Sequence, residues 1–136
     1  MAIVIDSSFI VSVFLENERN SKKAKEIFHD LLLKKDDIFV PTLLGPEVLG
    51  TIRRNTGDLR FCEIVEDKLN YWFDNMIHLK DLTRDSMNSA IETSIRLGLR
   101  GADAIFVSLA KDLNAEFLTF DEEVKKKIKD KVKLYS

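Results

Sequence analysis

The chain has 136 residues, 45% of them hydrophobic and 32% charged, as in an ordinary soluble globular protein that can bury a core. Its formal net charge of −2 argues against a broadly basic nucleic-acid-binding protein, but an acidic site neutralised by metal ions is compatible with that charge. The lone Cys62 excludes an intrachain disulfide and a thiolate metal cluster. No signal peptide or membrane span is apparent, so we expect one cytoplasmic domain over residues 1–136.

The first part of the chain alternates between short apolar runs and amphipathic stretches. The elements that we expect there are a strand at Ala2–Ile5, helices at Phe9–Leu15 and Asn20–Lys34, a strand at Ile38–Val40 closed by Pro41, and a helix at Thr42–Asn55. The first strand is a continuous apolar run, which is typical of a strand buried on both faces of a parallel sheet. Gly45-Pro46 is expected to delay or kink the start of the helix at Thr42–Asn55.

The second part of the chain continues the alternation. We expect helices at Leu59–Phe73, Arg84–Leu97, Ala104–Leu113 and Glu122–Lys129, and strands at Met76–Leu79, Glu116–Thr119 and Val132–Tyr135. Thr83 is a candidate N-cap and Gly98 a candidate end of the helix Arg84–Leu97, whose predicted inner face is Met87, Ala90, Ile91 and Ser94. Strands alternating with helices predict an α/β domain with a parallel sheet covered on both faces.

Four acidic residues stand near the predicted ends of strands or the starts of helices: Asp6, Glu47, Asp103 and Asp121. Each has an ordinary structural explanation, because Asp often caps a helix and a first-turn Glu is favoured by the helix dipole. In a parallel sheet, however, the positions that follow the strands meet at one edge, where open α/β sheets place their chemistry. Four carboxylates gathered there would repel one another unless divalent cations neutralised them. Oxygen ligands without His or Cys favour Mg²⁺ or Mn²⁺, and such a site suits phosphodiester hydrolysis.

Short motifs containing these acids occur in order along nearly the whole chain. They are Ile3-Val4-Ile5-Asp6-Ser7-Ser8, Pro46-Glu47-Val48, Gly101-Ala102-Asp103-Ala104 and Leu118-Thr119-Phe120-Asp121. The ordered set resembles the PIN domain family, and more narrowly its VapC-like toxin ribonucleases. The resemblance implies a three-layer α/β/α sandwich with a roughly five-stranded parallel sheet of order 3-2-1-4-5. It also implies a metal-dependent ribonuclease acting on single-stranded or looped RNA, with the four acids as its catalytic and metal-binding quartet.

The resemblance extends to supporting residues and to partners. Thr119 and Ser8 match positions where the family keeps a small polar group, although hydrogen bonding at a strand end or helix cap also explains them. Arg100 is a candidate phosphate contact because it precedes Asp103, and the alternative is an ordinary solvated charge. Family members often form homodimers, and the toxins are inhibited by a small antitoxin. Both are therefore expected partners here.

Other features leave alternatives open. The aromatic residues Tyr71, Trp72 and Phe73 suit either core packing or an interface with a second copy or an antitoxin. His29 and His78 lack ligand spacing and are expected to be structural or exposed. A non-catalytic partner-binding domain would use the acids to bind a metal or as caps. A receiver-like signalling domain would want a second acid where Ser7 and Ser8 stand, so it ranks low.

Overall fold

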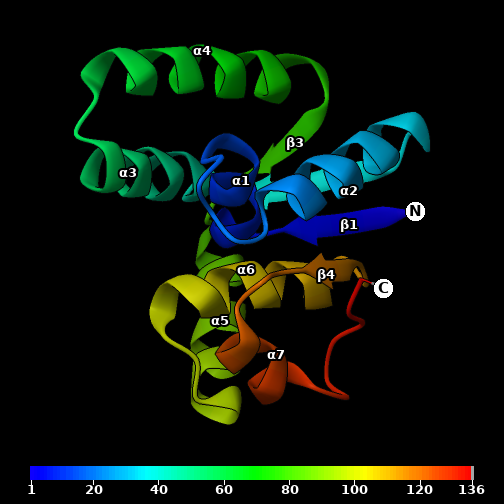
Figure 1. The fold of residues 1–136 in the computed structure, drawn as a ribbon. Helices are drawn as coiled ribbons and strands as arrows, with labels where there is room; N and C mark the ends of the chain where they lie inside the picture. The colour runs from blue at the N-terminus through cyan, green and yellow to red at the C-terminus, as the bar shows by residue number, and fades with distance from the viewer. Residues whose placement is uncertain (136) are drawn as a thin grey trace.

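A computed structural model describes residues 1–135, within which four parallel strands form one sheet. The strands are β1 (Ala2–Ile5), β2 (Asp37–Pro41), β3 (Ile77–Lys80) and β4 (Glu116–Leu118). Their order across the sheet is β3-β2-β1-β4, with β1 paired to β2 and β4 on either side (Figure 1). β1 is therefore a central strand, as its continuous apolar sequence predicts, and its last three residues are all buried.

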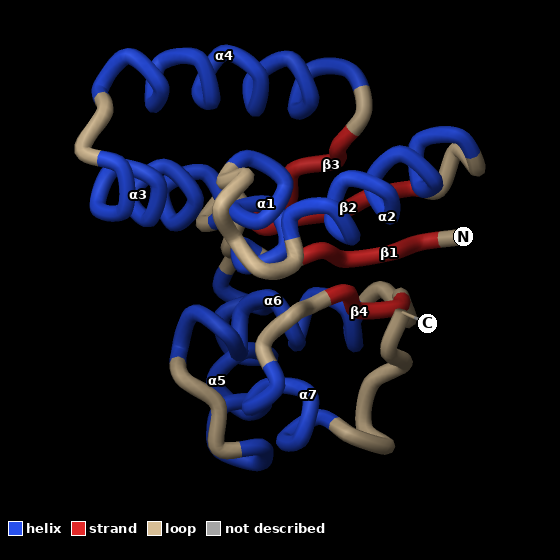
Figure 2. The backbone as a smooth tube through the Cα atoms, viewed as in Figure 1, coloured by secondary structure: helices blue, strands red, loops and turns tan. Residues whose placement is uncertain are grey.

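Helices cover both faces of this sheet. They are α1 (Ser7–Phe14), α2 (Ser21–Leu33), α3 (Leu44–Thr56), α4 (Leu59–Asn75), α5 (Arg84–Leu97), α6 (Gly101–Asp112) and α7 (Glu122–Ile128). In Figures 1 and 2, α2 passes in front of the strands and α6 behind them, with α5 packed on α6. The predicted three-layer α/β architecture is confirmed. None of the described helices has both the length and the apolar content needed to cross a membrane.

The expected fifth strand at Val132–Tyr135 is reduced to a single bridge between Phe117 and Leu134. The Phe117 amide donates to the Lys133 carbonyl at 2.8 Å, and the Tyr135 amide donates to the Phe117 carbonyl at 3.0 Å. The segment therefore lies beside β4, where the fifth strand was predicted, but it pairs over too few residues to count as one. The prediction of five strands is wrong by one, because β4 itself is only three residues long.

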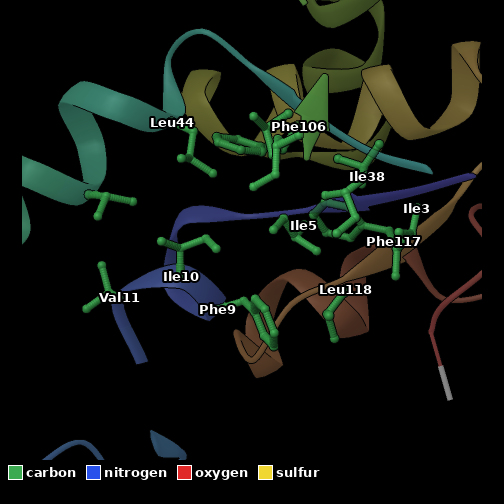
Figure 3. Packing of buried hydrophobic residues seen from close by; sticks show 14 of the residues in the cluster. Ile3, Ile5, Phe9, Ile10, Val11, Ile38, Leu44, Phe106, Phe117 and Leu118 are labelled. Carbon is green, nitrogen blue, oxygen red and sulfur yellow. The ribbon is translucent and has the colours of Figure 1, made fainter. Parts of the chain in front are cut away.

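The core lies where the central strand meets the helices. Ile5 in β1 and Phe9 and Ile10 in α1 are fully buried, and they pack with Phe117 of β4 (Figure 3). The ring of Phe9 contacts that of Phe120 with centroids 5.5 Å apart. Replacing a buried Phe by Ala typically costs about 3–5 kcal/mol, so this cluster holds the start of α1 firmly against β4.

Helix ends follow the predicted signals, with two corrections. Thr83 and Ser86 form a capping box at the start of α5, and Gly98 ends it with φ of 64°. α3 begins at Leu44, two residues after the predicted start at Thr42, and Pro46 stands inside its first turn, where its missing N–H is not needed. The predicted inner face of α5 is wrong at Ile91, which is 48% exposed while Thr93 is buried. Because α5 packs on α6 rather than on the sheet, its buried face is narrower than a full helical stripe.

Candidate active site

Asp6 is a buried carboxylate at the carboxyl end of the central strand. It is the N-cap of α1, since its Oδ1 accepts a hydrogen bond from the Phe9 amide at 3.1 Å. Ser8 Oγ also donates to Oδ1, at 2.7 Å, and Thr119 Oγ1 donates to Oδ2. Burial raises the pKa of Asp6 from 3.8 to about 6, with the three hydrogen bonds acting in the opposite direction and the charge of Asp103 raising it further. The predicted cap role is confirmed, but a cap alone does not require a buried charge.

Thr119 and Ser8 join Asp6 to the segment after β4. Thr119 Oγ1, besides donating to Asp6, accepts a hydrogen bond from the Asp121 amide at 3.0 Å. Ser8 Oγ accepts a longer bond from the Phe120 amide at 3.4 Å. Two hydroxyl groups therefore fix the position of the β4–α7 connection relative to Asp6. The small polar residues that the sequence analysis singled out are both in contact with this carboxylate.

Asp121 and Asp103 lie at the starts of two neighbouring helices. Asp121 is the N-cap of α7, and its cap bonds to the amides of Glu123 and Val124 use only Oδ1. Asp103 is in the first turn of α6, and its side chain is 27% exposed. The two acids share a hollow of about 310 Å³, which Arg100 and Lys127 also line. Glu123 lines it as well, so the hollow presents three acids and two bases to solvent.

Glu47 reaches the same edge of the sheet from α3. It stands in the first turn of that helix, half-buried, and accepts a hydrogen bond from Ser7 Oγ at 2.8 Å. Because Ser7 directly follows Asp6 in the chain, this bond ties the start of α3 to the start of α1. No role for Ser7 is predicted from the sequence. Its only signal was its place between two residues of the first acidic motif.

The four acids thus reach one edge of the sheet from four different elements, as the motif order predicts. A family model that describes the PIN domain matches residues 3–129 of the sequence. The chain belongs to the PIN domain family. No curated protein sequence gives a significant match to it. Because the PIN domain model matches residues 3–129, the receiver-like alternative is wrong.

Solved structures with the same fold include toxins and complexes of bacteria. The PIN domain aligns with VapC20 of Mycobacterium tuberculosis, described as a toxin that cleaves the sarcin-ricin loop, at a TM-score of 0.74 and 16% identity, covering 91% of this chain and 93% of that one. FitAcB of Neisseria gonorrhoeae gives a TM-score of 0.76 at 11% identity, covering 98% and 96%. VapBC2 of Rickettsia felis, bound to a DNA fragment from its promoter, gives 0.69 at 15% identity, covering 99% and 98%. At these identities the likeness concerns the fold.

The donor atoms at this edge of the PIN domain are of the type that Mg²⁺ and Mn²⁺ prefer, namely carboxylate and hydroxyl oxygens. The charge of Asp103 raises the pKa of Asp6, so these two carboxylates repel one another. Within residues 1–135, however, no three acidic, His or Cys side chains are close enough together to form a metal site. The donor atoms are therefore of the right kind for a divalent ion, but the acidic side chains would have to move closer together to coordinate it.

The remaining candidate functional residues lie at the edge of the acidic cluster, the group formed by Asp6, Glu47, Asp103 and Asp121, or outside it. The Arg100 side chain is 84% exposed and its Nε lies 3.4 Å from Asp103 Oδ2, so it stands at the mouth of the hollow. His29 is exposed, and the ring of His78 packs on Phe39. The aromatic cluster divides between core and surface, because Trp72 is buried whereas Tyr71 is 61% exposed.

Proposed function

We propose that this PIN domain is a ribonuclease dependent on Mg²⁺ or Mn²⁺ that hydrolyses phosphodiester bonds of single-stranded or looped RNA. The observation that carries the proposal is the buried carboxylate of Asp6 beside the charge of Asp103, at the carboxyl end of the central strand. No ion pair to Asp6 occurs among the described residues. A buried carboxylate without a counter-ion is costly, and a divalent cation would remove that cost.

Asp6, Glu47, Asp103 and Asp121 are the residues that would hold the ion. A bound divalent ion would activate water as the nucleophile and stabilise the developing charge on the phosphate. The residues of the chain itself set the positions of its ligands. Thr119 and Ser8 fix the two oxygens of Asp6, and Ser7 orients Glu47. Arg100, at the mouth of the hollow, is placed to contact a phosphate of the substrate.

The substrate class and the partners rest on the proteins that share this fold. VapC20 is described as cleaving the sarcin-ricin loop, and a toxin–antitoxin complex of Klebsiella pneumoniae aligns over 98% of this chain. These likenesses support the further proposal that the protein is the toxin of a VapBC-type pair. It would then act on RNA in the cytoplasm, form a homodimer and be inhibited by a small antitoxin.

Cleavage of a labelled RNA pool tests the proposal. Wild-type protein is incubated with Mn²⁺ or Mg²⁺ and compared with the same reaction in EDTA and with Asp103→Asn. A matched control is Asp74→Asn, which changes an exposed acid of α4 outside the acidic cluster. We expect cleavage by wild type and Asp74→Asn, and its loss in EDTA and in Asp103→Asn. Equal cleavage by Asp103→Asn and wild type would show that the activity is a contaminant or uses another site.

A non-catalytic partner-binding domain is the second candidate. It is favoured by one observation, namely that no group of three potential ligands is preformed within residues 1–135. Calorimetric titration with Mn²⁺ separates the two candidates without relying on an RNA target. Binding that is lost in Asp6→Asn and kept in Asp74→Asn supports the nuclease. No binding of Mn²⁺ by wild type would favour the partner-binding domain.

A further inference from the structure

A second groove, of about 390 Å³, runs along β4 on the side of the sheet that α2 covers. Its volume falls within the roughly 300–1,000 Å³ that small-molecule sites occupy. Lys23 and Ile27 of α2, Lys125 of α7, and the C-terminal residues Leu134 and Tyr135 contribute to its walls. In Figure 1 the C-terminal segment returns from α7 to lie beside β4, where Leu134 forms its bridge with Phe117.

One end of the groove is lined by residues that contact Asp6 and Ser8. Thr119 lines it and also donates the hydrogen bond to Asp6 that fixes the buried carboxylate. Phe120 lines it too, with its amide bonded to Ser8 Oγ and its ring packed on Phe9. The inner end of the groove is therefore built from residues whose positions are set by the same hydrogen bonds as Asp6. Anything bound in it would lie next to the proposed cleavage site.

The lining combines an apolar floor with two cations from different helices. Phe117, Leu118 and Phe120 provide ring and aliphatic surface from the β4 segment. Lys23 is exposed on α2, and the Lys125 side chain is 36% exposed and 3.5 Å from Glu122. Aromatic surface with flanking lysines matches single-stranded nucleic acid, whose bases stack while its phosphates meet the cations. A purely apolar peptide would offer no partner charge to Lys23 and no second one to Lys125, which already pairs with Glu122.

We propose that this groove holds the unpaired nucleotides next to the scissile bond of an RNA substrate, with a base against Tyr135 and Phe120 and phosphates at Lys23 and Lys125. The inference rests on the proposed ribonuclease function and deepens it. Because the floor is mostly carbon, the groove selects by stacking and strand flexibility rather than by reading base edges. RNA duplexes, whose bases are stacked on one another, would be excluded.

Binding of a fluorescent single-stranded RNA, measured by anisotropy, tests the groove apart from cleavage. The protein carries Asp103→Asn in every sample, so that RNA stays intact, and Mn²⁺ is present. Lys23→Gln with Lys125→Gln should weaken binding about tenfold near physiological salt and reduce the slope of log K against log salt by about 1.4. The matched control is Lys22→Gln with Lys126→Gln, which removes the same charge from the neighbouring exposed positions.

A second pair of variants tests stacking. Tyr135→Leu should weaken RNA binding about tenfold, whereas Tyr71→Leu, at the exposed tyrosine of α4, should leave it unchanged. Duplex RNA should bind more weakly than single strands to all proteins with an intact groove. If the groove variants and the control variants bound single-stranded RNA equally well, the proposed role of the groove would be wrong, while the proposed ribonuclease function would be unaffected. RNA bound by none of the proteins would overturn both.

Discussion

Thr119 Oγ1 donates a hydrogen bond to Asp6 Oδ2, joining two residues 113 positions apart in the sequence. The same oxygen accepts the Asp121 amide, so one hydroxyl group is shared between two acids of the proposed quartet. Thr119 does not need to touch a metal ion or a phosphate to matter. Its effect is to hold a carboxylate in place and to favour its charged form.

Thr119→Val is therefore expected to disturb the site although it preserves the shape of the side chain. The pKa of Asp6 should rise further, because the Thr119 hydrogen bond lowers it, and cleavage should fall about 10- to 100-fold, the usual effect of losing a group that orients a ligand. Thr119→Ser keeps the hydroxyl and serves as the control. The pH profile of cleavage measures the effect, and a profile that does not move in the valine variant would argue against this role.

Asp6 should make folding stability depend on pH in the absence of divalent ions. Its folded-state pKa of about 6 lies above the ordinary value of 3.8, so the folded chain holds this proton more tightly than the unfolded chain. The stabilising contribution is complete below about pH 3.8 and is lost as the pH rises through about 6. At about 1.4 kcal/mol per pKa unit, the change approaches about 3 kcal/mol.

Urea unfolding in EDTA at several pH values measures that contribution as the difference between wild type and Asp6→Asn, since the variant cannot titrate there. The free energy of unfolding of Asp6→Asn should increase relative to that of wild type as the pH rises from 4 to 7. Asp74→Asn corrects for the loss of one acid elsewhere. A difference between wild type and Asp6→Asn that stays constant over this range would show that Asp6 is not perturbed.

Ser7→Ala should lower cleavage about tenfold while changing the free energy of unfolding by no more than about 1 kcal/mol. The substitution removes the hydrogen bond that orients Glu47, but it leaves a half-buried carboxylate that water can still reach. Ser89→Ala is a matched control, because it removes a similar bond to Asp112 on the surface. Steady-state kinetics and urea unfolding on both variants separate orientation from stability. Equal losses of activity in the two would contradict a specific role for Ser7.

Arg100→Gln should raise KM several-fold with little change in kcat or in stability. The Arg100–Asp103 pair is largely exposed, and such pairs contribute about 0–1 kcal/mol to folding. The matched control is Arg96→Gln, which breaks the exposed pair with Glu92. If kcat fell instead and KM stayed the same, Arg100 would act on the transition state rather than on substrate binding.

Sequence patterns predicted the elements well where one face or both faces of an element had to be buried. The strand Ala2–Ile5 and the helix Arg84–Leu97 have the predicted bounds, because a continuous apolar run and a Thr83–Gly98 cap pair leave few alternatives. The exposure of Ile91 was not predictable from the sequence. Periodicity indicates that a helix has a buried face, but the width of that face depends on how the neighbouring helix packs against it. The prediction of a strand at Val132–Tyr135 failed for a related reason. How many residues of that segment can pair depends on the length of β4, which is only three residues.

The positions of the four acids in the fold could be predicted from the sequence, but their hydrogen bonds could not. The order of the acidic motifs placed Asp6 at the carboxyl end of the first strand, which the structure confirms. The bond from Ser7 to Glu47 joins residues 40 positions apart and has no local signal in the sequence. Likewise, a cap and a metal ligand call for the same residue type, so the sequence could not say that Asp6 would be a buried cap. The roles of the four acids in metal binding stay predictions.

The pairing of Phe117 with residues 133 and 135 has a consequence for how the sheet meets other chains. An unpaired strand edge is a template on which another extended segment can add, and proteins protect such edges. Here the chain uses its own C-terminal segment to occupy the outer hydrogen-bonding groups of Phe117. The opposite edge, β3, is only four residues long and carries exposed His78 and Lys80, which discourage addition by other means. Growth of the sheet into larger assemblies is thus opposed at both sides, by self-pairing at one and by a short polar strand at the other.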